Sequence, residues 1–210
     1  MIRKILMAAA AVLTFSSVSF AAGAHDGLVC TGCHDIHYAK DSFIFAVAAN
    51  KVATSPSTKK TYSGVTALCL GCHADAEHGG MGIKPISQHT THPFGTPPNP
   101  KIARVPRALL RDSKMDCVSC HDPHPSNPNY RYLRTDTKGG SEMQYFCAMC
   151  HPAKADNSVS NQAMKTLKVF TSMDESKGPT TSTVGELTAA PDASPAETAP
   201  AAAPAAAPKK

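Results

Sequence analysis

The hydrophobic positions of this chain form one long run at its start and only short groups after it. Ile5 to Val18 is mostly apolar, follows Arg3 and Lys4, and precedes the small residues Ala22-Gly23-Ala24. This order is typical of a secretory signal peptide. A membrane anchor would need about 20 apolar residues, and a serine cluster interrupts this run first. We therefore expect residues 1–24 to be a signal peptide.

Removal of this segment would leave an exported protein with no membrane span. Cleavage after Ala24 would make His25 the N-terminus, and cleavage after Ala21 is the alternative. The expected location is the periplasm, the cell surface or the exterior.

After the signal peptide, the pattern favours little regular structure. Trp is absent, aromatic residues make up 6%, and prolines are frequent between Pro85 and Pro106. Each proline removes a backbone donor and fixes one dihedral angle. From Pro179 onward Thr, Ser, Ala and Pro dominate, a composition that does not bury enough apolar surface to fold. We expect residues 156–210 to be a disordered Ala/Pro-rich tail, with at most loose helical turns from Lys154 to Glu175.

Four copies of the pattern Cys-x-x-Cys-His contain every cysteine of the chain. They are Cys30, Cys33 and His34; Cys69, Cys72 and His73; Cys117, Cys120 and His121; and Cys147, Cys150 and His151.

This pattern indicates covalent attachment of c-type haem. Two thiols three positions apart can add to the two vinyl groups of one porphyrin, and the next residue brings an imidazole to the iron. Zinc ribbons, redox pairs and a disulfide framework also use repeated cysteines, but none needs histidine directly after the second cysteine each time. We therefore predict four haems c, with His34, His73, His121 and His151 as proximal ligands.

The charge of the chain gives no separate indication of a partner. The formal net charge is +5, and it would fall to +3 after loss of Arg3 and Lys4. Haem propionates would reverse it. Nucleic-acid binding needs a clustered basic surface, and the sequence contains no such cluster.

Histidines outside the motifs are candidates for the second axial position of each iron. His37 and His124 each lie three residues after a proximal histidine, on roughly the same side of a helix or turn. Neither can reach the opposite face of its own haem, so each is expected to bind a neighbouring haem. This cross-ligation would hold two porphyrins close together.

The remaining candidates lie in loops or near the N-terminus. His89 and His92 are three residues apart before Pro93, and we favour His92 because Pro93 and Gly95 imply a fixed turn. His78 precedes two glycines and is expected to be exposed. His25 would act in the same chain or reach a haem of another subunit, unless it is a free end.

The motifs and the stretches Cys117 to His124 and His92 to Gly95 resemble those of paired CXXCH multihaem c-type cytochromes, found in metal-reducing bacteria. The resemblance covers about Gly27 to Pro152. Within that group the chain is similar to extracellular tetrahaem cytochromes that polymerise into conductive filaments. There an axial histidine of one subunit completes a haem of the next, which would give His25 that role. The Ala/Pro tail matches no pattern of this group.

Together these features predict a multihaem cytochrome c, mostly irregular with few short helices after the motifs, wrapped around four covalently bound haems. Residues 25–155 would form the tetrahaem domain. Two dihaem modules, about 25–80 and 110–155, would flank a Pro-rich loop. The expected function is electron transfer without catalysis, toward other multihaem cytochromes or extracellular acceptors, with a homo-polymer as one form. The alternative is a small reductase with one open haem, acting on an oxyanion or a metal ion.

Overall fold

The computed structural model describes residues 24–39, 44–86, 92, 94–173 and 178–189. Residues 1–23 of the expected signal peptide and His89 lie outside these residues. The helices are α2 (Gly64–His73), α3 (Cys117–Cys120), α4 (Met143–Cys150), α5 (Asn157–Thr166) and α6 (Val184–Ala189), and the strands are β1 (Lys168–Thr171) and β2 (Thr180–Thr183). The predicted irregular fold with few short helices agrees with this arrangement, and the small sheet is an addition to it.

The cysteine motifs lie at the ends of helices. α2 ends at His73, α3 ends at Cys120, and α4 ends at Cys150, while Cys30–Gly32 is a 3₁₀ turn. The motif itself forms the last helical turn in these three, which the expectation of helices after the motifs did not include. This placement puts both thiols of a motif on one side of that turn. After the fourth motif, a 3₁₀ turn at Pro152–Lys154 and α5 do follow.

A capping box starts α3 directly before the third motif. The Asp116 carboxylate accepts a hydrogen bond from the backbone N–H of Ser119 at 3.1 Å, and the Ser119 hydroxyl accepts one from the backbone N–H of Asp116 at 3.0 Å. Two backbone donors that would lack a helical partner are satisfied in this way. The cap therefore fixes where the turn carrying Cys117 and Cys120 begins.

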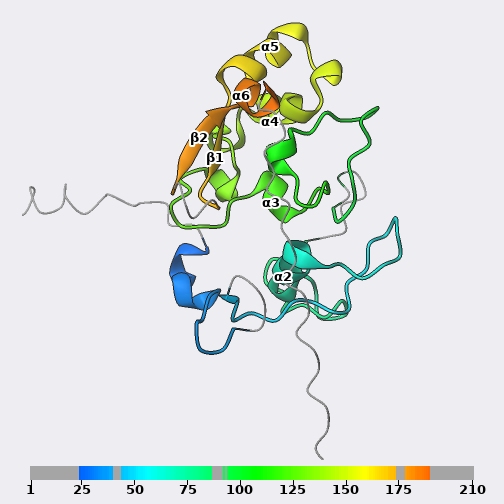
Figure 1. The fold of residues 1–210 in the computed structure, drawn as a ribbon, viewed down its shortest axis with the longest axis vertical. Coiled ribbons are helices and arrows are strands. Elements are labelled where there is room, and N and C mark those ends of the chain that lie inside the picture. Colours follow the sequence, from blue (N-terminus) through cyan, green and yellow to red (C-terminus); the bar gives the residue numbers. More distant parts are fainter. Residues whose placement is uncertain (1–23, 40–43, 87–91, 93, 174–177, 190–210) are drawn as a thin grey trace, which may run out of the picture.

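The larger of two apolar clusters joins α4 to the C-terminal elements. Leu109, Met149, Val169 and Val184 are its buried members. The smaller cluster consists of Leu70 of α2, Ala74 directly after α2, and Ala53. In Figure 1, α2 lies in the lower part of the molecule, α3 in the middle, and α4, α5, α6 and the sheet at the top.

The prediction of a disordered tail from residue 156 is wrong for residues 157–173 and 178–189. α5 packs on α4, and β1 pairs antiparallel with β2, with Lys168 opposite Thr183 and Thr171 opposite Thr180. Val169 and Val184 are 2% and 0% exposed. These segments are part of the folded domain because they cover Met149 of α4. Residues 190–210 lie outside the described residues.

Over the described ranges, no helix combines the length and apolar character that crossing a membrane requires.

Candidate haem-binding sites

Each of the four motifs presents two free thiols. None of the eight cysteines forms a disulfide bond. Within the part of the chain that the structure describes, no three His, Cys, Asp or Glu side chains converge as a site for a bare metal ion. Pairs of thiols three residues apart, next to an imidazole, are the donor set that covalent haem attachment uses.

Three motif histidines have one ring nitrogen already engaged by a backbone carbonyl. Nδ1 of His73 lies 2.7 Å from the oxygen of Ile83, Nδ1 of His121 lies 3.0 Å from that of Arg131, and Nδ1 of His151 lies 3.0 Å from that of Ile102. A carbonyl only accepts, so Nδ1 must carry the proton in each ring. Nε2 is then left as the unprotonated nitrogen that binds a metal.

Two of the three carbonyls that hold these rings lie at the same offset from their histidine, whereas Ile102 precedes His151 by 49 residues. Ile83 follows His73 by ten residues, and Arg131 follows His121 by ten residues. The second and third motifs therefore use the same local loop to orient their histidine. The ring of His34 in the first motif stacks on Phe45, with ring centroids 4.9 Å apart.

Thiols of successive motifs lie near one another in space. The interacting pairs are Cys33 with Cys72, Cys69 with Cys117, and Cys120 with Cys150. The motifs thus form one continuous series in chain order, from the N-terminal turns past α2 and α3 to α4 (Figure 1).

Burial raises the pKa of the second thiol in the third and fourth motifs, whereas an interaction with Cys69 lowers the pKa of Cys117. Loss of solvent contact raises the pKa of Cys120 to about 11 and that of Cys150 to about 12. At neutral pH both groups are therefore S–H, the form that adds across a vinyl double bond to give a thioether.

Large apolar side chains stay exposed beside the motifs. Val29, directly before Cys30, is 63% exposed, and Ile102, whose carbonyl holds His151, is 62% exposed. Met81, whose sulfur lies 3.6 Å from Cys72 Sγ, is 70% exposed. A porphyrin attached at the cysteines would cover apolar surface of this kind, which favours it over a polar ligand. The residues present therefore fit covalent haem.

Two of the candidate axial histidines lie close to a motif histidine. The ring centroid of His25 lies 5.9 Å from that of His73, and the centroid of His92 lies 6.0 Å from that of His151. An iron between two imidazoles requires two metal–nitrogen bonds of about 2 Å and two ring radii of about 1.1 Å, so the centroids should be about 6 Å apart. Both observed separations match this requirement.

His25 lies half-buried in a group of histidines. Burial lowers its pKa, a bond to the Pro123 carbonyl opposes this, and the neighbouring His73 lowers the pKa further. His121 is close enough to both rings that each also lowers its pKa, after the larger effect of burial. His25 therefore lies close to the proximal histidines of both the second and the third motif.

His124 is held by a buried carboxylate. Its Nδ1 lies 2.9 Å from Asp122 Oδ1 and 3.0 Å from Ser172 Oγ. The bond to Asp122 raises the pKa of His124. Burial alone would raise the pKa of Asp122, but its bonds to His124 and Ser172 outweigh burial and lower it. The structure therefore orients His124, and its binding of iron stays a prediction.

His37 is exposed, and its backbone N–H donates to Asp35 Oδ1 at 2.7 Å. Its part in cross-ligation is also still a prediction. His89 lies outside the described residues.

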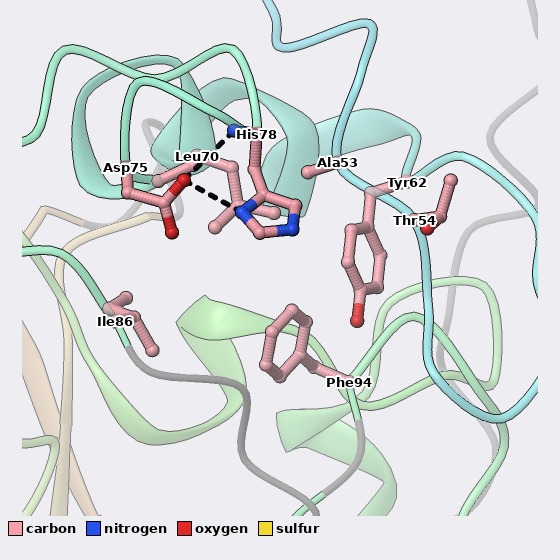
Figure 2. Close-up of a pocket in the computed structure, with 9 residues that line it drawn as sticks. Ala53, Thr54, Tyr62, Leu70, Asp75, His78, Ile86 and Phe94 are labelled. Carbon is pink, nitrogen blue, oxygen red and sulfur yellow. Dashed lines mark hydrogen bonds and ion pairs between the residues drawn. The ribbon is translucent and has the colours of Figure 1, made fainter.

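His78 has a fixed orientation that sequence reasoning missed. Its Nδ1 lies 2.7 Å from Asp75 Oδ1, and this bond lowers the pKa of Asp75. The signal in the sequence was Asp75 three residues earlier. Figure 2 shows the ring at the edge of a cavity, across from Tyr62 and Phe94. This cavity of about 30 Å³ has room for about one water molecule, so it is not the place of a porphyrin.

Residues 112–156 match the family model for a doubled CXXCH motif. No curated protein and no solved structure matches the chain. The matched segment holds the third and fourth motifs, together with His124 and the capped start of α3. The match supports covalent binding of haem c, a relation to multihaem c-type cytochromes, and a role in electron transfer.

Proposed function

We propose that this protein is an exported electron carrier that holds four haems c, each with two histidine ligands. The observation that carries the proposal is the series of neighbouring motifs, in which Cys33 is close enough to Cys72, Cys69 to Cys117, and Cys150 to Cys120 for the second thiol of each pair to raise the pKa of the first. Groups attached at these thiols would lie in a row, with each one next to the following one.

Bound haem supplies a one-electron centre whose iron changes oxidation state without changing its ligands. The chain's own contribution is to fix the spacing of the row and the orientation of each imidazole. The carbonyls of Ile83, Arg131 and Ile102 accept from Nδ1 of the proximal histidines. Hydrogen bonds of this kind make an imidazole more basic and stabilise its bond to iron. Together with histidine as the second ligand, they favour low reduction potentials.

The neighbouring pairs His25 with His73 and His92 with His151 support closed irons. An iron with two protein ligands has no position for a substrate, which favours a carrier over a reductase. The remaining haems are those of the first and third motifs. Because neither histidine can bind the haem of its own motif, His124 is the proposed ligand of the first haem and His37 that of the third, with His89 as a substitute for either. This assignment requires the first and third haems to approach each other beside the second.

The expected partners are proteins or acceptors outside the cytoplasm, because the chain is expected to be exported and its motifs lie at the surface. Other multihaem cytochromes or extracellular acceptors would exchange electrons with the row at its ends. A homo-polymer would extend the row from one subunit to the next. Size-exclusion chromatography with light scattering on the mature protein would distinguish a monomeric carrier from a filament subunit.

Haem counting and spectroscopy of the purified protein test the proposal. Mass spectrometry and the pyridine haemochrome spectrum should give four haems per chain. Electron paramagnetic resonance should show only low-spin iron, and the reduced protein should bind no carbon monoxide. One high-spin iron that binds the gas would support the reductase alternative. Fewer than four haems would overturn the proposed row.

A further inference from the structure

The first described residues of the chain are fastened to a turn that follows the third motif. Tyr132 Oη accepts hydrogen bonds from the backbone N–H of His25 at 3.0 Å and from that of Asp26 at 3.2 Å. The same hydroxyl donates to Asp26 Oδ1 at 2.7 Å. One side chain therefore makes three contacts to the segment that precedes the first motif, more than 100 positions away in the sequence.

The ring of His25 is fixed on two sides. It stacks on the Tyr132 ring with centroids 5.2 Å apart and an angle of 20° between the planes. The Pro123 carbonyl lies near the ring and interacts with it. A carbonyl only accepts, so it favours the tautomer in which the nearer ring nitrogen carries the proton and the other nitrogen keeps its lone pair. A metal-binding histidine is usually prepared in this way.

The His25 ring lies beside the proximal histidine of the second motif. His73 has its Nδ1 on the carbonyl of Ile83, and its ring centroid lies 5.9 Å from that of His25. Two imidazoles in direct stacking contact would be nearly parallel, whereas these two planes are 46° apart. The separation instead matches the value of about 6 Å for two ligands of one iron.

The turn that holds His25 has an uncommon backbone. Arg131 and Tyr132 have φ angles of 53° and 55°, in the left-handed region that residues with side chains seldom adopt. Two such residues in succession persist where the surroundings require them, commonly at functional sites. Here Arg131 turns its carbonyl to His121 Nδ1, and Tyr132 turns its hydroxyl to His25 and Asp26. The turn thus orients histidines that belong to two neighbouring haems.

We propose that Tyr132 is a positioning residue that clamps His25 as the second axial ligand, within the same chain, of the haem attached at Cys69 and Cys72. The inference rests on the proposed function, because it assigns one ligand of that tetrahaem row. It makes the N-terminal segment a link between the two predicted dihaem modules. It also differs from the expectation that His25 completes a haem of another subunit.

Two variants of the complete, haem-loaded protein test the clamp. His25→Ala should leave four haems attached but open one, which becomes high-spin and binds one equivalent of carbon monoxide after reduction. Added imidazole should restore the low-spin spectrum. Tyr132→Phe keeps the ring stack but loses the hydroxyl, so it should open the same haem in part of the molecules. Tyr130→Phe, which removes a hydroxyl from the same turn, is the matched control and should behave as the unaltered protein.

The position of the ligand in the same chain is tested by dilution. If His25 acts within its own chain, the low-spin spectrum of the unaltered protein should be the same at every protein concentration. Opening of one haem on dilution would overturn the proposal in favour of a ligand from another subunit. His25→Met provides a second variant with a potential ligand, and a raised midpoint potential of one haem is expected because methionine replaces histidine.

Different results would contradict the positioning of His25 by Tyr132 and the proposal of an electron carrier. If His25→Ala leaves every haem low-spin, the assignment of His25 is overturned while the carrier proposal stands. An open haem in the unaltered protein contradicts the closed carrier itself. If Tyr132→Phe leaves the spectra unchanged while His25→Ala opens a haem, Tyr132 has no positioning role and that part of the proposal is overturned.

Discussion

Arg134 donates a hydrogen bond from Nε to the carbonyl oxygen of Phe170 at 3.1 Å. Its Nη1 donates to the carbonyl of Val118 at 3.1 Å. The side chain is buried, and burial lowers its pKa, which the nearby Asp122 opposes. One guanidinium group therefore ties β1 to α3, the turn that carries the third motif.

Replacement of Arg134 by Leu should weaken the whole fold. The variant keeps apolar volume but leaves two carbonyls without their donors, and hydrogen bonds from charged groups contribute about 1.5–3 kcal/mol each. We expect the free energy of unfolding to fall by about 3 kcal/mol, measured by guanidinium denaturation of the haem-loaded protein. Lys165→Met, at an exposed position of α5, should leave the midpoint unchanged. Equal midpoints for both variants would contradict the role of Arg134.

Truncation at the predicted start of the tail should destabilise the protein. A chain that ends at Asp156 loses Val169, Phe170 and Val184, which are 2%, 8% and 0% exposed. Burial of each such side chain contributes about 1.5–3 kcal/mol. Compared with a chain that ends at Ala189, we therefore expect a loss of several kcal/mol or failure to fold. Thermal unfolding of the two truncated proteins tests this, and equal melting temperatures would restore the disordered-tail prediction.

The failure of the tail prediction has a definite physical cause. Residues 157–166 are mostly polar and small, and β1 and β2 are four residues each, so no strong periodic pattern marks them. Their structure comes from packing against Met149 of α4 and against Leu109, which lies far away in the sequence. Composition reports the average of a segment, whereas here a few buried positions decide its fold.

The motifs were predictable because their chemistry depends on local spacing alone. The second axial ligands were not, because the sequence offers six histidines for four positions. The structure brings His25 and His92 to motif histidines through contacts over long sequence distances. It also gives His78 a carboxylate partner, Asp75, which its position before two glycines did not suggest.

Removal of the Asp122 carboxylate should loosen both β1 and His124. Asp122 is fully buried, and it accepts from the backbone N–H of Ser172 at 2.6 Å and from its hydroxyl at 2.9 Å. Asp122→Ala leaves these donors unpaired, so we expect a loss of about 2–3 kcal/mol in guanidinium denaturation. Asp136→Ala, which breaks an exposed ion pair with Lys138, should have no measurable effect.

Asp122→Ala combined with Ser172→Ala measures how strongly the two side chains depend on each other. The double variant should lose less than the sum of the single losses, because the second change removes a donor that has already lost its acceptor. Additive losses would show that the contact contributes little.

Two substitutions of Asp116 should change the stability of the protein in opposite directions. Burial raises the pKa of this carboxyl above its ordinary value of 3.8, although Arg111 and the bonds to Ser119 oppose the shift. A raised pKa means that the ionised form is less favourable in the folded state. Stability is therefore lost as the pH rises from 3.8 through the folded-state pKa.

Asp116→Asn keeps a good N-cap without the charge. Its stability relative to the unaltered protein should increase as the pH rises from about 3.8 to 7. Asp116→Ala removes the cap and should lose about 1 kcal/mol at neutral pH. Urea unfolding across this pH range provides the measurement, and a constant difference between Asp116→Asn and the unaltered protein would contradict the raised pKa.

Replacement of His92 should open the haem of the fourth motif. The His92 ring lies 6.0 Å from that of His151 at an angle of 65°, and the Ile102 carbonyl accepts from Nδ1 of His151. Loss of the His92 imidazole leaves one axial position to water or an added ligand. We expect His92→Ala to retain four haems, to show one high-spin iron, and to bind one equivalent of carbon monoxide after reduction.

His89→Ala separates the two histidines of this loop. It removes the same group three residues earlier, so an effect on the loop as a whole would appear in both variants. If His92 is the ligand of the fourth haem and His89 serves no other, only His92→Ala should bind carbon monoxide. If His89→Ala opens a second, spectroscopically different haem, His89 replaces His37 or His124 in the ligand set. If only His89→Ala opens a haem, the proximity of His92 to His151 does not reflect ligation, and the ring-distance criterion fails for this motif.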